Sequence, residues 1–262
     1  MTQNATIEVS RDGAVARLTF NRPAVLNALN AELLDAALDA ARAIAESDAR
    51  VLVLTGAGTR AFSAGVDLKA GQGFDREATK RFNDQARGLI HLLETMPQIT
   101  IARVNGYCFT GGFEIALGCD FIIAADDAQF SDTHVKLGLT SPWGISQRLA
   151  RLIGWMRAKE LCVSARRVGA REALAIGLIL DAVPAAELDA RIDRLVAEIS
   201  ANNAGAVAAY KRQFRDAQNC FLDDGLKTVA AARISFADNS KPDAAITTVP
   251  VPGPGPGSSR SR

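Results

Sequence analysis

Glu114 is the residue whose type and position first suggest chemistry. It stands three residues after Gly111 in the run TGGFEIAL, which is otherwise apolar and predicts the first turns of a buried helix. A buried, ionised carboxylate is costly unless something compensates its charge. Gly111 and Gly112 let the backbone approach a ligand closely, and amides at a helix start can bind an oxyanion. A carboxylate about one turn from free amide donors predicts an active site.

Residues that could hold a metal are sparse. The chain has only two histidines, His91 and His134, and its four cysteines form no CxxC pair. No carboxylate cluster with metal-ligand spacing replaces them. We therefore expect no catalytic metal and no disulfide framework.

The overall composition narrows the classes of partner. The chain has 262 residues and a net charge of +1. Its overall electrostatic field is therefore too weak to attract the protein to nucleic acid or to an acidic membrane. The first residues show no basic-then-apolar signal segment, and no apolar run is long enough to span a bilayer. We expect a cytoplasmic protein that binds neither nucleic acid nor membrane.

Hydrophobic periodicity predicts the elements that must position Glu114. Residues 7–20 alternate as a β-hairpin with Asp12-Gly13 at its turn, and Asn30 caps a helix that runs to about residue 46. Further strands are expected at 51–55, 99–104 and 121–125, with a loop at 56–73, a helix at 77–94 and the short helix of Glu114. Strands that alternate with helices and are apolar throughout indicate an α/β fold with a largely parallel sheet.

Helices dominate the C-terminal part of the sequence. Amphipathic helices are predicted at 187–201, 204–217 and 222–237, and a short strand at 178–183. Residues 247–262 contain Pro-Gly repeats and Ser-Arg, and this composition indicates a disordered tail.

Three segments together resemble the crotonase superfamily, the enoyl-CoA hydratase/isomerase group. NRPAVLNAL at 21–29 is similar to its first CoA-contact loop, and residues 56–69, with AFSAGVDLK at their end, to its first oxyanion segment. NGY at 105–107 and GGFE at 111–114, followed by Cys119-Asp120, are similar to its second. The resemblance spans residues 7 to about 237. It implies a ββα spiral core at 1–200, a helical trimerisation region at 201–246 and a tail at 247–262.

The resemblance also implies roles for individual residues. The amides of Ala64 and Gly111 would form an oxyanion hole for a thioester carbonyl, where one donor can contribute roughly 3 to 4 kcal/mol. Glu114 would be the catalytic carboxylate that activates water. Positions matching the CoA-contact loops are Ala24, Leu26, Val66, Asp67 and Leu68. Arg22, Lys69 and Lys136 could neutralise CoA phosphates or simply lie on the surface.

His134 is the main departure from the family pattern, because it stands where hydratases carry a second glutamate. An imidazole can still exchange protons near neutral pH, or it can be a hydrogen-bonded structural residue. Asp132, two positions earlier, either orients His134 or is exposed. The Gly-rich sequence usual shortly afterward is also changed around Trp143, so the acyl pocket can differ in shape.

The resemblance thus implies an acyl-CoA enzyme in which the CoA thioester is substrate and no separate cofactor is needed. The most direct expectation is hydration of a 2-enoyl-CoA by a homotrimer or dimer of trimers in fatty acid metabolism. Enoyl-CoA isomerase and acyl-CoA hydrolase activities remain open, as does a non-catalytic acyl-CoA-binding protein. Dinucleotide binding at Gly56-Ala57-Gly58 is disfavoured because the third glycine of that motif is missing.

Overall fold

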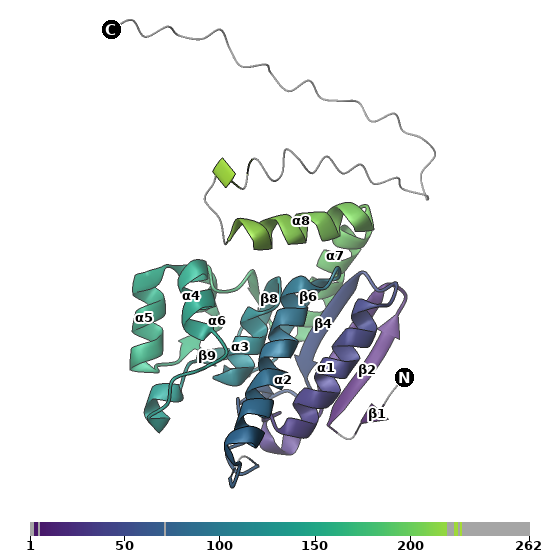
Figure 1. Cartoon of the computed structure of the whole chain (residues 1–262). Helices are drawn as coiled ribbons and strands as arrows, with labels where there is room; N and C mark the ends of the chain where they lie inside the picture. The colour runs from purple at the N-terminus through teal and green to yellow at the C-terminus, as the bar shows by residue number, and fades with distance from the viewer. Residues whose placement is uncertain (1–2, 5, 71, 219–222, 225, 227–262) are drawn as a thin grey trace, which may run out of the picture.

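The computed structural model of the chain describes residues 3–4, 6–70, 72–218, 223–224 and 226 (Figure 1). The main sheet has the strand order β1-β2-β3-β4-β6-β8-β11 in this part of the chain. Its strands are β1 (Gln3–Asn4), β2 (Ile7–Asp12), β3 (Val15–Phe20), β4 (Val51–Gly56), β6 (Ile99–Val104), β8 (Phe121–Ala125) and β11 (Asp181–Val183). β2 and β3 form the predicted hairpin, and β3 to β11 pair in parallel. The predicted α/β class is confirmed.

The central strands are covered on both faces, as their apolar sequence predicts. In β4, Leu52 and Leu54 join the larger core, whereas Val51 and Val53 join a second, smaller core. Helices α1 (Ala31–Ala45) and α2 (Arg76–Thr95) lie side by side over the larger core (Figure 1). Helix α7 (Leu188–Ser200) covers the opposite face through apolar side chains in the smaller core.

A second sheet, which the sequence did not predict, has the order β10-β9-β7-β5 among the described residues. It consists of β5 (Ala61–Ser63), β7 (Tyr107–Phe109), β9 (Gln129–Ser131) and β10 (Val168–Gly169). The chain repeats one order of elements, a strand of the main sheet, a strand of the second sheet and a helix. β4 is followed by β5 and α2, and β6 is followed by β7 and α3 (Gly111–Leu117). These repeats form the expected ββα spiral. They bring the residues after β5 and β7 to neighbouring positions.

The helix boundaries agree closely with the prediction. Asn30 caps α1 by accepting from the amide of Leu33, and Asp75 caps α2 by accepting from the amide of Ala78. The strand predicted at 178–183 is shorter than expected, because Leu178 donates back to Ala173 and the strand begins only at Asp181.

The C-terminal part continues with short elements and helices. These are η2 (His134–Leu137), α4 (Ile145–Ile153), α5 (Trp155–Ser164), α6 (Ala170–Ala175), η3 (Ala185–Glu187) and α8 (Ala204–Ala217). A further short helix, η1 (Pro23–Val25), lies between β3 and α1. Helix α8 matches the prediction. The helix expected at 222–237 and the tail at 247–262 lie outside the described residues, apart from isolated positions, so the division at 200 and 246 stays a prediction. No helix in the described part is long and apolar enough to cross a bilayer.

Candidate active site

A strained turn at Thr110 starts the helix that carries Glu114. Thr110 has a φ of +44°, which is unfavourable for a residue with a branched side chain, and its amide donates to the carbonyl of Ser131 in β9 over 2.9 Å. Helix α3 begins at the next residue, so the Gly111 amide has no acceptor within the helix. Within the described residues no hydrogen bond from this amide is found. The turn therefore presents Gly111 as a donor.

The two expected oxyanion segments lie against each other, as the sequence predicts. The hydroxyl of Thr110 donates to the carbonyl of Ala64 over 3.4 Å, across 46 residues of sequence. A Cβ at Gly112 would lie only 2.6 Å from Cβ of Ser63, so glycine permits this approach. The Ala64 amide, however, donates to the carbonyl of Leu26 over 2.9 Å. A thioester oxygen would have to replace that carbonyl.

Main-chain hydrogen bonds join the expected CoA-contact loop to the first oxyanion segment. The Leu29 amide donates to the carbonyl of Gly65 over 2.7 Å, and the Asp67 amide donates to the carbonyl of Leu29 over 2.8 Å. Asp67 also pairs with Arg22 at 2.9 Å. The structure therefore gives Arg22 a partner within the protein. The other expected CoA-contact residues lie on the same two segments. Ala24 and Leu68 are exposed, and Val66 is half-buried.

Glu114 is almost fully buried, at 1% exposure. The hydroxyl of Ser141 lies 2.6 Å from each of its carboxylate oxygens, and the amide of Ile145 donates to Oε1 over 3.0 Å. Burial raises the pKa of Glu114 to about 7, although the Ser141 hydroxyl and the charge of His134 act to lower it. A carboxyl group with this pKa can accept or release a proton near neutral pH.

Asp132 orients His134 and is not exposed. Its Oδ1 lies 2.6 Å from Nδ1 of His134, and its side chain is 6% exposed. Burial acts to lower the pKa of His134, but the hydrogen bond and charge of Asp132, together with the charge of Glu114, outweigh it, and the pKa is raised. Because Nδ1 is occupied, Nε2 is the nitrogen left for proton exchange. The charges of Glu114 and His134 act on each other, but no hydrogen bond joins them within the described residues.

Trp143 lies directly against the turn at Thr110 and Gly111. A Cβ at Gly111 would lie 2.4 Å from Cζ3 of Trp143 and 3.2 Å from Cδ1 of Leu29. The indole Nε1 donates to Oδ1 of Asn83 over 2.8 Å, which holds the ring in place. From its residue type alone, Trp143 could belong either to the core or to an acyl pocket. It is buried and it borders Gly111.

Sequence reasoning missed Ser141, which contacts Glu114 from 27 positions further along the chain. A serine in a loop carries no periodicity or motif, so only the folded structure reveals this contact. In the described part of the chain, no group of three or more histidine, cysteine, aspartate or glutamate residues is arranged to hold a metal ion.

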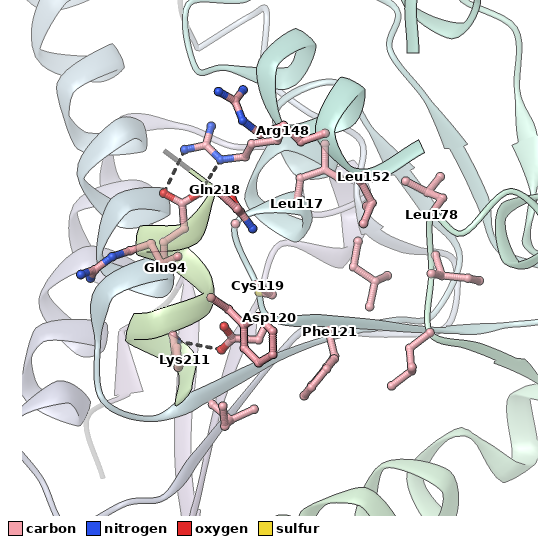
Figure 2. Close-up of a pocket in the computed structure, with 18 of the residues that line it drawn as sticks. Glu94, Leu117, Cys119, Asp120, Phe121, Arg148, Leu152, Leu178, Lys211 and Gln218 are labelled. Atoms are coloured by element: carbon pink, nitrogen blue, oxygen red, sulfur yellow. Dashed lines mark hydrogen bonds and ion pairs between the residues drawn. The ribbon is translucent and has the colours of Figure 1, made fainter. Parts of the chain in front are cut away.

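A separate cavity of about 910 Å³ lies between α8, α4 and β8 (Figure 2). Its lining includes Leu117, Phe121, Leu152 and Leu178, together with two ion pairs, Arg148 with Glu94 and Lys211 with Asp120. None of the predicted site residues lines it.

The ββα spiral, with two adjoining loops beside a buried carboxylate, defines the class of the protein as an α/β spiral fold. The family model for enoyl-CoA hydratase/isomerase matches residues 10–240, and the chain belongs to that family. The resemblance and the crotonase-like fold are thereby confirmed.

Three similar proteins illustrate the relationship. The short-chain-enoyl-CoA hydratase of Clostridium acetobutylicum is 36% identical over 220 residues, which cover 83% of this chain and 84% of that protein. The crystal structure of enoyl-CoA hydratase from Bacillus anthracis is similar with a TM-score of 0.84 and 35% identity. The match covers 86% of this chain and 88% of that chain. A protein of Thermobifida fusca YX in complex with CoA is similar with a TM-score of 0.81 and 31% identity. This match covers 87% of this chain and 91% of that chain.

Proposed function

We propose that the protein adds water across the double bond of a 2-enoyl-CoA to form a 3-hydroxyacyl-CoA. The observation that carries the proposal is the buried Glu114, with a pKa of about 7, three residues after the Gly111 amide. Family membership supports it, and so does the similarity to a short-chain-enoyl-CoA hydratase.

The proposed reaction begins with polarisation of the thioester. The carbonyl oxygen binds the amides of Ala64 and Gly111, after the Leu26 carbonyl leaves Ala64. These donors stabilise the negative charge that develops on the oxygen when water attacks the β-carbon. Binding at two main-chain amides also fixes the acyl chain relative to Glu114.

Proton transfer completes the addition. Ionised Glu114 takes a proton from the attacking water, and the imidazolium of His134 gives one to the α-carbon. The pair then holds the same number of protons as before, with the acid and base forms exchanged. Return of one proton from Glu114 to His134 restores the starting state, and the mutual effect of their charges on both pKa values supports this coupling.

The surrounding loops complete the proposal. Ala24, Leu26, Val66, Asp67 and Leu68 contact the CoA moiety of the substrate, and no further cofactor takes part. The protein acts in the cytoplasm as a homotrimer or a dimer of trimers, with residues 201–246 at the subunit contacts. The CoA complex of the similar Thermobifida fusca protein supports CoA as the recognised group.

Replacement of Glu114 tests the proposal directly. Glu114→Gln keeps the shape and the acceptor oxygen but removes the base, so kcat for hydration of a short 2-enoyl-CoA should fall by at least about 10²-fold. Glu77→Gln, on the exposed start of α2, is the matched control. Unchanged hydration in Glu114→Gln would contradict the assignment.

Isotope labelling separates hydration from the alternatives. In heavy-oxygen water, hydration of a 2-enoyl-CoA places the label on the product, whereas double-bond isomerisation of a 3-enoyl-CoA leaves the mass unchanged. Hydrolysis releases free CoA and a labelled acid. Tight binding of CoA esters without turnover would identify a non-catalytic acyl-CoA-binding protein instead.

A further inference from the structure

The groups that hold the Glu114 carboxylate come from a different segment of the chain. Glu114 lies on α3, whereas its two hydrogen-bond donors, the Ser141 hydroxyl and the Ile145 amide, belong to the loop and first residue of α4. The Ser141 oxygen is 2.6 Å from both Oε1 and Oε2. A hydroxyl has one proton to donate, so it serves one of these oxygens at a time.

A second contact sets the direction of the Ser141 hydroxyl. The amide of Trp143 donates to Oγ of Ser141 over 3.1 Å, which occupies an acceptor site of the hydroxyl oxygen. The hydroxyl proton is then directed at the carboxylate. Trp143 is itself fixed by Asn83 and by its contact with Gly111, so the loop that supports Glu114 is also tied to the turn at Thr110 and Gly111.

We propose that Ser141 is a positioning residue for Glu114: its hydroxyl holds the carboxylate in one orientation and favours the ionised form that accepts a proton from water. Hydrogen bonds to a charged group are among the stronger ones in proteins, and a buried carboxylate depends on them to stay ionised. This inference rests on the proposed function, because it takes Glu114 as the base.

Other titratable groups also act on Glu114, and they come from different elements. His134, at the start of η2, favours the ionised carboxylate, whereas Asp132, just before η2, opposes it. The thiol of Cys162, on α5, also lies within electrostatic reach of Glu114. All three remain in place when Ser141 is replaced, so the contribution of the hydroxyl can be measured separately.

The test compares Ser141→Ala and Ser141→Thr with the matched control Ser146→Ala, whose hydroxyl is exposed and contacts Gln147. Loss of the hydroxyl should raise the midpoint of Glu114 ionisation by roughly 1 to 2 pH units. Because Glu114 must be ionised to act, the acid limb of the pH profile of kcat/KM should move to higher pH by the same amount. The threonine variant keeps the donor and should restore the wild-type profile.

A direct titration keeps this inference separate from the proposed function. The carbonyl stretching band of protonated Glu114 can be followed by infrared difference spectroscopy on the full chain, with Glu114→Gln identifying the band. This readout needs no turnover, so absence of hydration in the wild-type protein would overturn the function while leaving the Ser141 inference measurable. An unchanged Glu114 midpoint in Ser141→Ala would overturn the inference.

Discussion

At the scale of single residues, the pKa values of Glu114 and Asp132 shift in opposite directions. Burial dominates at Glu114 and raises its pKa to about 7. At Asp132 burial also acts to raise the pKa, but the hydrogen bonds and charge of His134 outweigh it, and the pKa falls below the usual 3.8. Asp132 therefore stays ionised and supports His134, while Glu114 is free to titrate. Environments that separate two carboxyl pKa values in this way are a recognised pattern in acid–base enzymes.

The first residue-scale prediction concerns Asp132→Asn. The amide keeps an acceptor for Nδ1 of His134 but removes the negative charge, so burial should prevail and the pKa of His134 should fall. The proposed acid is the imidazolium, so the alkaline limb of the hydration profile should move to lower pH. NMR titration of the imidazole measures the pKa directly, and a His91→Gln background leaves a single histidine signal. A pKa that stays at its wild-type value would contradict the expected role.

The same pair also affects stability. His134 has a raised pKa in the folded state, so its contribution is complete below the unfolded value near 6.5 and is lost as the pH rises through the folded value. Asp132 has a lowered pKa, so its contribution is present above the unfolded value near 3.8 and is lost as the pH falls through the folded value. The Asp132–His134 pair therefore stabilises the fold most between about pH 3.8 and pH 6.5. Asp132→Asn should reduce the free energy of unfolding in this pH range.

At the scale of elements, the site depends on how closely α3 approaches its neighbours. The turn before α3 lies on the segment after β5, and Trp143 from the loop before α4 lies on Gly111. Both contacts leave no room for an added side-chain carbon. The glycines of this turn thus serve packing as well as access of a ligand to the backbone.

The element-scale prediction is that Gly111→Ala destabilises the fold by about 1 to 3 kcal/mol through overpacking against Trp143. Combining it with Trp143→Leu should remove part of this cost, which a double-mutant cycle of urea unfolding measures as a coupling energy. Gly169→Ala is the matched control, since nothing lies within 4 Å of a Cβ at that position. Strict additivity of the two substitutions would contradict the predicted contact.

At the scale of the whole molecule, a buried lysine attaches helix α8 to the spiral core. Nζ of Lys211 donates to the carbonyls of Leu93 and Gln98 at 2.7 Å each. It also pairs with Asp120 at 2.8 Å (Figure 2). Its side chain is 4% exposed, and burial lowers its pKa despite the charge of Asp120. One side chain thus joins α8 to the end of α2, the start of β6 and the turn before β8.

The whole-molecule prediction is that Lys211→Met lowers the free energy of unfolding by about 3 kcal/mol, because it leaves Asp120 and two carbonyls without their cation. Lys159→Met, at an exposed position of α5, should change it little. Chemical denaturation followed by circular dichroism measures both. Equal stability of the two variants would show that α8 is held by other contacts.

The main sheet and its helices could be predicted from the sequence, whereas the second sheet could not. Leu34, Leu38 and Ala41 recur at helical spacing, and Val51 to Leu54 form a continuous apolar run, so local pattern alone indicates these elements. Strands such as Ala61–Ser63 are too short to show alternation, and they exist because distant segments pair with them. The same reason explains the site. Glu114 and Gly111 belong to one local motif, whereas the Ser141 contact depends on long-range folding.

The hydrogen bond from the Ala64 amide to Leu26 has a consequence for how a ligand would enter the proposed oxyanion hole. The Ala64 amide already has an acceptor within the protein, the carbonyl oxygen of Leu26. A thioester oxygen that binds there would compete with the Leu26 carbonyl for the N–H of Ala64. Binding would exchange one hydrogen-bond acceptor for another. A ligand without a hydrogen-bond acceptor at that position cannot replace the Leu26 carbonyl, so this internal bond disfavours such ligands.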